Sequence, residues 1–137
     1  MKKSIAHYSW SGTTKKAAQK LAKKEGADLL EITVPGHVYE LGMRQVADLA
    51  ISQLENKEYP VIAHDQVPLV SYDQIIVAAP VWSGEPAVPA YSFLKELAKR
   101  GYQGKVSAFE TDAGSTGKFF ASFAAEAKSL GLDYDQK

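Results

Sequence analysis

The chain has 137 residues, of which 45% are hydrophobic, and this length and composition predict one globular domain spanning residues 1–137. It contains no cysteine, which excludes disulfides, thiolate catalysis and thiolate metal sites. Sixteen basic residues balance sixteen acidic ones, so the overall charge favours neither a nucleic acid nor an anionic membrane as partner. Because no apolar run is long enough for a signal peptide or a membrane span, we expect a soluble, cytoplasmic protein.

Four short apolar runs alternate with four longer segments of helical periodicity. The runs cover residues 4–8, 28–34, 74–80 and 105–111, and the helical segments cover residues 13–25, about 41–56, 88–100 and 118–130. In each helical segment apolar residues recur every three or four positions, which predicts one face packed on a core. A repeated strand–helix order predicts an α/β fold with three α/β/α layers, in which a doubly wound parallel sheet carries helices on both faces.

The first apolar run leads into residues 9–14, SWSGTT, which open the first helical segment. The N-terminus of a helix offers backbone N–H groups without intrahelical partners and the positive end of the helix dipole, so it holds an anion without a basic side chain. Gly12 lets the backbone curl around such an anion. Hydroxyl groups that can donate to it stand on Ser9, Ser11, Thr13 and Thr14. Residues 9–14 are therefore predicted to be a phosphate-binding turn.

Two more loops follow the third and fourth apolar runs. They are residues 80–86, PVWSGEP, and residues 111–117, TDAGSTG. In an open parallel sheet all three loops lie at the carboxyl ends of strands, and ligands bind there, at the point where the strand order reverses. The three loops are therefore predicted to converge on one molecule.

These three motifs, in this order after these strands, resemble the loops of the short flavodoxin-like family, and the resemblance covers most of the chain. It implies a flavodoxin-like fold with strand order 2-1-3-4-5 and FMN bound noncovalently at the strand ends. The residues that it implies as FMN contacts are Ser9, Trp10, Ser11, Gly12, Thr13 and Thr14 at the phosphate, Pro80, Val81, Trp82, Ser83 and Gly84 along the isoalloxazine, and Thr111, Asp112, Ala113 and Gly114 in the third loop.

The energies of the expected contacts rank these residues. A hydrogen bond to a charged group contributes roughly 1.5–3 kcal/mol, whereas aromatic stacking adds roughly 0.5–1.5 kcal/mol beyond burial. Replacing Ser11 or Thr13 by a bulky apolar residue is therefore expected to weaken FMN binding more than replacing Trp82, which should chiefly change the redox potential.

The second and third loops carry two finer expectations. The resemblance implies that a peptide beside Gly84, either Ser83–Gly84 or Gly84–Glu85, turns to hydrogen-bond the flavin N5. The third loop contains no aromatic residue, so the second flavin face is covered by Tyr39 or His37 from residues 35–42, or is left open. Asp112 either accepts a hydrogen bond from the flavin pyrimidine edge or caps its own loop.

Two departures from the family pattern matter for assembly and partners. After the last helical segment only GLDYDQK remains, so we expect a short or missing fifth strand and no last helix. A strand edge left open in this way favours association, which predicts a homodimer. The balanced charge also differs from the acidic character of electron-shuttling flavodoxins.

The resulting hypothesis is an FMN-binding electron-transfer protein that works with redox partner proteins or a small electron acceptor and has no catalytic side chain. One alternative is an FMN-dependent NAD(P)H:quinone-type oxidoreductase, which direct turnover of NAD(P)H would identify. Another is a flavodoxin-like binding domain that has lost flavin. No metal site is expected, because the spacing of His7, His37 and His64 matches no ligand pattern.

Overall fold

The fold is known from a computed structural model, which describes residues 2–9, 12–36, 43–82, 84–111 and 117–136. Its strands are β1 (Lys3–Tyr8), β2 (Asp28–Thr33), β3 (Ala63–His64), β4 (Gln74–Trp82), β5 (Glu85–Pro86), β6 (Lys105–Thr111) and β7 (Asp133–Tyr134). Its helices are α1 (Thr13–Glu25), α2 (Met43–Asn56), α3 (Val88–Lys99) and α4 (Phe119–Ser129), with a short 3-10 helix, η1 (Leu69–Ser71). The four predicted helices and the four predicted strands are all present.

The sheet has the strand order β3-β2-β1-β4-β6-β7, and β5 pairs with the end of β4. β1, β2, β4, β6 and β7 run parallel to one another, whereas β3 is antiparallel to β2 and β5 is antiparallel to β4. Without the two-residue strands β3 and β5, this order is the predicted 2-1-3-4-5. The fifth strand of that order, β7, is short as expected, with only two residues.

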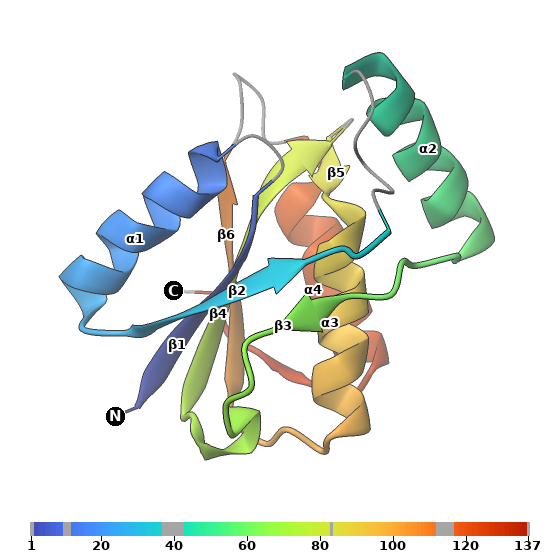
Figure 1. The fold of residues 1–137 in the computed structure, drawn as a ribbon. Coiled ribbons are helices and arrows are strands. Elements are labelled where there is room, and N and C mark those ends of the chain that lie inside the picture. Colours follow the sequence, from blue (N-terminus) through green and yellow to red (C-terminus); the bar gives the residue numbers. More distant parts are fainter. Residues whose placement is uncertain (1, 10–11, 37–42, 83, 112–116, 137) are drawn as a thin grey trace.

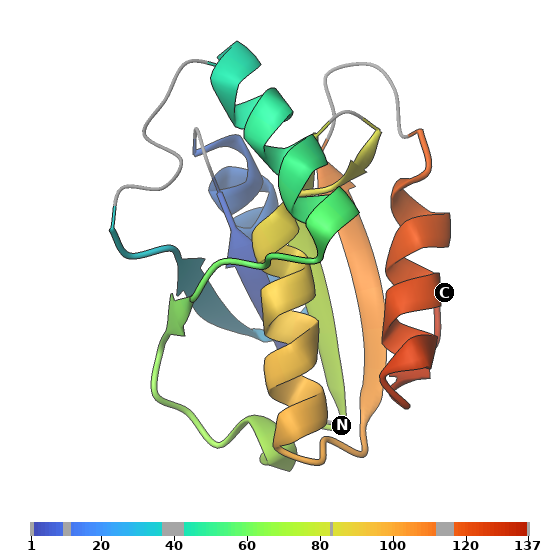
Figure 2. The ribbon, with the colours of Figure 1, turned by 90° about the vertical axis from the view of Figure 1, so that its right-hand side faces the viewer.

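Helices cover both faces of the sheet, as the alternating pattern predicts. Figures 1 and 2 show α1 alone on one face and α2, α3 and α4 on the other. The larger core lies under the three helices and includes Phe93, Phe119 and Phe123, which are fully buried. A smaller cluster under α1 joins Ile5 of β1 to Ile76 of β4. A single helix suffices on this face because α1 contacts all four central strands, β1, β2, β4 and β6.

The period of the strands explains how the two cores are separated. In β1, Ile5 belongs to the cluster under α1, while Ala6 and Tyr8 belong to the larger core. Alternate side chains of a strand point to opposite faces, so one apolar run supplies both layers. At the end of α1, Gly26 adopts a left-handed conformation with φ 64° and its N–H bonds to the carbonyl of Ala22, which ends the helix and lets the chain enter β2.

The amino ends of the parallel strands are tied together by Asp73. Its N–H donates to the carbonyl of Lys2 at 2.7 Å, and its carbonyl accepts from the N–H of Lys105 at 2.9 Å. Beside it the buried Tyr102 hydroxyl donates to the carbonyl of Tyr72 at 3.0 Å. Gly104 is required here, because a Cβ would lie 2.7 Å from the carbonyl oxygen of Asp73.

The outer edge of β6 is paired beyond β7 by a side chain. The N–H of Ala108 donates to Oε1 of Gln136 at 2.9 Å, and Nε2 of Gln136 donates to the carbonyl of Ala108 at 2.8 Å. The Gln136 amide thus takes the position that a peptide group of a longer strand would occupy. The edge that was expected to lie open is therefore satisfied as far as Ala108.

Candidate functional site at the carboxyl ends of the strands

The turn between β1 and α1 is closed by its own side chain. Oγ of Ser9 accepts the N–H of Gly12 at 2.7 Å, and Gly12 has φ 91°, a left-handed conformation that favours glycine. The helical hydrogen bonds then begin with the N–H of Lys16, which donates to the carbonyl of Gly12 at 3.2 Å. The N–H groups of the first turn therefore have no acceptor within the helix, which is the arrangement that binds anions at helix N-termini.

One hydroxyl contact joins the first and third loops. Oγ1 of Thr14, at the start of α1, lies 2.6 Å from Oγ1 of Thr111, the last residue of β6. Thr14 is 2% exposed, so its hydroxyl is directed into the protein and not toward solvent. Thr13, by contrast, is exposed. Thr14 therefore joins the first loop to the third, and the contacts of Ser9, Thr13 and Thr14 with a phosphate stay predictions.

The second loop is a β-hairpin. Val81 pairs with Pro86 and Trp82 with Glu85, so only Ser83 and Gly84 lie between the paired ends. Gly84 has φ 77°, the conformation that a tight turn of this kind requires of glycine. The second loop thus places Gly84 at the tip of a short hairpin above the sheet.

A contact between two glycines joins the second loop to the third. A Cβ on Gly117 would lie 2.6 Å from Cα of Gly84, which no side chain tolerates. Beside this contact the N–H of Lys118 donates to the carbonyl of Gly84 at 2.7 Å. That carbonyl belongs to the Gly84–Glu85 peptide, so turning this peptide would break the bond. Of the two peptides expected to reorient, Ser83–Gly84 is the one without this restraint on its described atoms.

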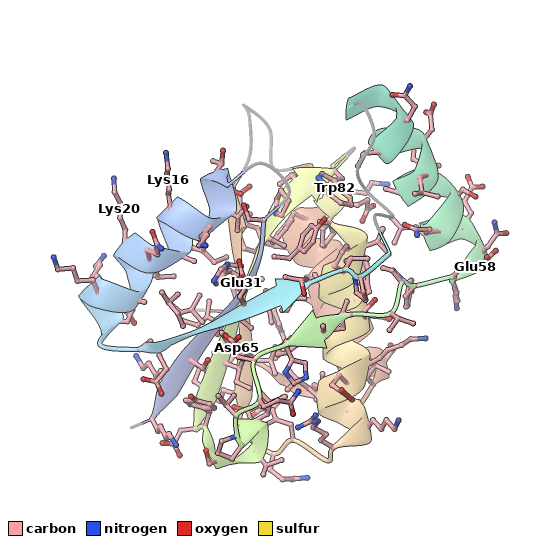
Figure 3. All side chains as sticks on the ribbon, in the orientation of Figure 1. Lys16, Lys20, Glu31, Glu58, Asp65 and Trp82 are labelled. Carbon is pink, nitrogen blue, oxygen red and sulfur yellow. The ribbon has the colours of Figure 1, made fainter. Side chains whose placement is uncertain are left out.

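Trp82 lies at the same edge but is packed into the core. Trp82, labelled in Figure 3, is 9% exposed. Its ring meets that of Tyr8 edge-on, with centroids 5.8 Å apart. The indole is thus supported by the end of β1 on one side. The predicted contact of Trp82 with the flavin ring stays a prediction.

Several predicted contacts lie outside the described residues. They are Trp10, Ser11, Ser83, Asp112, Ala113 and Gly114, together with Tyr39 and His37. Among the predicted positions that are described, Ser9, Gly12, Thr13, Thr14, Pro80, Val81, Trp82, Gly84 and Thr111 all lie at this one edge of the sheet. Sequence reasoning did not assign the backbone of Gly117 and Lys118 or the ring of Tyr8 to the site, because contacts between distant segments leave no local pattern.

The described geometry fits FMN at its phosphate end. The N-cap of α1 is Gly12, which has no side chain to accept the first amides, and the first turn contains no acidic residue. Among the described residues, no atom lies within 4 Å of a Cβ placed at Gly12. A helix N-terminus with nearby hydroxyls and no acidic residue is what a phosphate monoester needs.

A buried histidine lies beneath the phosphate turn. His7 of β1 is 3% exposed, faces α1, and is paired in register with Glu31 of β2, which in turn forms an ion pair with Lys15 at 3.7 Å. The described residues give Nδ1 of His7 no hydrogen-bond partner. Burial lowers the pKa of His7 below its ordinary value of 6.5, the Glu31 carboxylate raises it, and the Lys15 ammonium lowers it. Burial thus disfavours the protonated form of the His7 ring.

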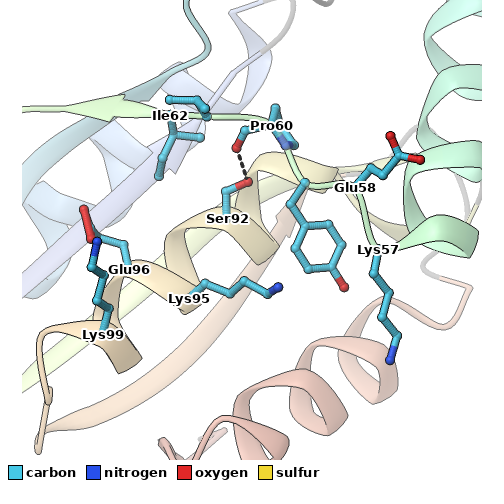
Figure 4. Close-up of a pocket in the computed structure, with 10 residues that line it drawn as sticks. Lys57, Glu58, Pro60, Ile62, Ser92, Lys95, Glu96 and Lys99 are labelled. Carbon is cyan, nitrogen blue, oxygen red and sulfur yellow. Dashed lines mark hydrogen bonds between the residues drawn. The ribbon is translucent and has the colours of Figure 1, made fainter.

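A separate groove lies beside α3, with a volume of about 460 Å³ (Figure 4). It lies between α3 and the chain segment 57–62, which is fastened by the Ser92 hydroxyl donating to the carbonyl of Pro60 at 2.7 Å. Nζ of Lys95 lies 4.5 Å from the ring centroid of Tyr59. None of its lining residues belongs to the three loops. This groove is therefore independent of the candidate flavin site.

Two negative findings apply to the part of the chain that the structure describes. No three histidine, aspartate or glutamate side chains there are grouped so as to hold a metal ion. Nor does any described helix combine the length and the apolar character needed to cross a membrane.

Solved structures with this arrangement are flavoproteins. The flavoprotein from Lactobacillus acidophilus NCFM, solved in complex with FMN, is 34% identical with a TM-score of 0.90, and the match covers 98% of this chain and 90% of that one. The apo form of the L. acidophilus flavoprotein, solved by NMR, is also 34% identical and has a TM-score of 0.76, with 98% and 88% covered. A putative flavoprotein from Bacteroides eggerthii, 22% identical over 98% and 85% of the chains, has a TM-score of 0.77 and shares the fold.

Among curated proteins none matches this chain. The sequence model of the Flavodoxin family, however, matches residues 2–123, which include all of the first two loops and the third loop at the end of β6. The strand order, the three converging loops and this match lead to one conclusion: the chain belongs to the flavodoxin family.

Proposed function

We propose that this chain binds FMN noncovalently at the carboxyl edge of its sheet and transfers electrons through it. The observation that carries the proposal is the convergence of the three loops, which the Thr14–Thr111 hydroxyl contact and the Gly84–Gly117 contact hold together. FMN bound there would supply the redox chemistry, and the protein would supply binding, orientation and the local field. The FMN complex of the 34% identical L. acidophilus flavoprotein supports this proposal.

Each loop has its own part in holding the cofactor. The first turn of α1 and the hydroxyls of Ser9 and Thr13 bind the phosphate. The hairpin tip at Gly84 and the edge of Trp82 lie along the ring system. Thr111 fixes the third loop against the first. This function needs no acid–base side chain. The protein would work as a single-domain carrier in the cytoplasm, with redox proteins or small acceptors as partners.

An absorbance spectrum of the freshly purified protein, followed by fluorescence titration with FMN, tests the proposal. We expect quenching with an affinity well below about 1 mM, since several hydrogen bonds to a phosphate should exceed the roughly 4 kcal/mol of millimolar binding. Weaker binding would overturn the proposal and favour a domain that has lost flavin. Rapid oxidation of NAD(P)H without a separate reductase would instead identify an oxidoreductase.

The ranking of contacts gives a matched pair of variants. Thr13→Leu removes a hydroxyl from the exposed start of α1 and should weaken FMN binding about tenfold or more, because bonds to a charged group contribute roughly 1.5–3 kcal/mol. Trp82→Phe keeps an aromatic ring beside Tyr8 and should change the affinity less. Equal losses in the two titrations would contradict the ranking.

A further inference from the structure

The outward face of α1 is covered by lysines. Lys16, Lys20, Lys23 and Lys24 are all exposed, and they recur at the three- and four-residue spacing of one helix face. We call these four residues the lysine face. Figure 3 shows Lys16 and Lys20 pointing away from the sheet, on the side of the molecule opposite Glu58.

The lysine face is not neutralised by the described residues around it. The neighbouring Lys15 forms an ion pair with Glu31 at 3.7 Å, and Glu25 at the end of the helix pairs with Lys3 at 3.2 Å. Among the described residues, the four lysines of the face form no ion pair. Like charges at these spacings destabilise a helix, and a cation in the first turn also opposes the helix dipole. The stability of α1 therefore does not explain why lysines stand at positions 16 and 20.

The charge of the whole chain is balanced, but its distribution is not. α1 holds five of the sixteen basic residues and only one of the sixteen acidic ones. It is therefore a positive pole on a molecule whose remainder is negative by the same amount. A pole of this kind orients an approaching charged partner, even where the net charge is zero.

The position of this pole connects it with the candidate FMN site. α1 begins directly after the phosphate turn, and Lys16 lies in its first turn. A protein seated on the lysine face would therefore lie beside the carboxyl edge of the sheet at the Lys16 end of the helix. This is the edge from which electrons would leave if the proposed function holds.

We propose that the lysine face is the docking surface for an acidic redox protein. The proposal rests on the proposed function and adds the charge of the partner to it. A membrane is a poorer occupant, because the large apolar side chains exposed on the described surface, Leu29, Ile51, Val61 and Val70, all lie off α1. Binding to a lipid interface normally combines basic residues with such apolar anchors.

Electron transfer between purified proteins tests this docking surface. The chain is loaded with FMN, reduced with dithionite, freed of excess reductant and mixed with ferric cytochrome b5, an acidic haem protein, or with ferric cytochrome c, a basic one. Each haem iron takes one electron, so two haems oxidise one fully reduced flavin, which releases its protons to the solvent. The second-order rate is followed by haem absorbance at several salt concentrations.

Two variants with equal changes in charge separate docking from net charge. The first is K16Q/K20Q/K23Q/K24Q, which removes the lysine face. The second is K57Q/K95Q/K99Q/K128Q, which removes four exposed lysines on the other side of the sheet, one directly after α2, two on α3 and one on α4. Glutamine is a good helix former, so α1 should persist, and circular dichroism checks that it does.

We expect the rate with cytochrome b5 to fall as salt rises, and to fall about tenfold at low salt in the lysine-face variant, because steering charges change association rates by tenfold or more. The rate of the control variant should stay within about twofold of that of the parent. Cytochrome c should react slowly at low salt, and its rate should rise as the salt concentration rises. Equal losses in both variants, or rates that do not respond to salt, would overturn the proposal.

Two further measurements keep the outcomes apart. Reduction of neutral benzoquinone by all three proteins should be equal, which shows that the flavin itself still reacts. If the parent binds no FMN, the proposed function fails before any partner is added. Binding to phosphatidylserine vesicles that disappears in the lysine-face variant would identify a lipid surface and overturn the docking of a protein.

Discussion

Thr14 and Thr111 are 97 positions apart in the chain, yet their hydroxyls lie 2.6 Å from each other. Thr111→Val removes the hydroxyl and keeps the shape, so Thr14 loses its partner in a buried position. We expect FMN binding to weaken by about five- to tenfold, in line with roughly 1 kcal/mol for one hydrogen bond. Thr111→Ser keeps a hydroxyl and should bind almost as the parent does. Fluorescence titration measures both, and equal affinities of the Val and Ser variants would contradict the role of the contact.

His7 predicts a dependence of stability on pH. Burial lowers the pKa of His7 in the folded protein, so below about pH 6.5 the unfolded chain takes up a proton that the folded one resists. The contribution of His7 to stability is therefore complete above its pKa in the unfolded chain. It is lost as the pH falls toward its lower pKa in the folded protein. His7→Gln should lose less stability than the parent between about pH 7.5 and pH 5.

Urea unfolding at the two pH values measures this difference, and the carboxylates common to both proteins cancel in the comparison. If the parent and His7→Gln lose equal stability, the His7 ring does not carry the effect.

At the scale of elements, the hairpin tip and the start of α4 meet through backbone alone. In Gly84→Ala the added Cβ would find only ordinary contacts, the nearest at 3.7 Å, and the cost is that of a left-handed conformation, about 1–2 kcal/mol. In Gly117→Ala the Cβ would lie 2.6 Å from Cα of Gly84, so the two loops must separate. We expect Gly117→Ala to weaken FMN binding more than Gly84→Ala. Fluorescence titration with FMN measures the affinity of both variants. The reverse order of affinities would show that the contact between the loops is dispensable.

The elements also show which parts of the fold a sequence can predict. α1 begins and ends where expected, because a glycine stands at each end, Gly12 and Gly26, and the apolar spacing persists between them. β3 was not predicted, since its two residues show no period and depend on pairing with β2. β5 was also missed, because it exists only through the hairpin that it forms with β4.

The candidate site was also predictable only in part. Its position was predictable, because the carboxyl ends of parallel strands lie at one edge whatever their sequence. The contacts that close it were not, since the Thr14–Thr111 and Gly84–Gly117 pairs depend on which loops become neighbours. The contact of Trp82 with Tyr8 was likewise not predictable, because only the strand order brings Tyr8 near, and the predicted place of Trp82 along the flavin stays a prediction.

At the scale of the whole molecule, the outer edge of the sheet depends on one side chain. Gln136→Ala would leave both backbone groups of Ala108 without the partners that they have at 2.9 and 2.8 Å. We expect a loss of about 1–3 kcal/mol in stability. Gln136→Glu keeps an acceptor for the Ala108 N–H and should lose less. Urea unfolding measures both losses.

The same edge bears on association. If an open β6 edge drives pairing between two chains, Gln136→Ala should form more dimer than the parent at equal concentration. Light scattering at micromolar concentrations measures this, and a purely monomeric parent and variant would dispose of the predicted homodimer.

The two ends of the sheet are held in different ways, and this has a consequence for hydrogen exchange. At the amino ends, the main chain of Asp73 bonds to Lys2 and Lys105, and the buried Tyr102 hydroxyl bonds to the carbonyl of Tyr72. At the carboxyl ends, the contacts that join the described parts of the loops are the Thr14–Thr111 hydroxyl contact, the Gly84–Gly117 contact and the hydrogen bond from Lys118 to Gly84. Local opening of those loops should therefore cost far less than global unfolding, so their amides should exchange by a route that low denaturant does not accelerate. Added FMN should slow that exchange at the loops and leave the amides near Asp73 unchanged.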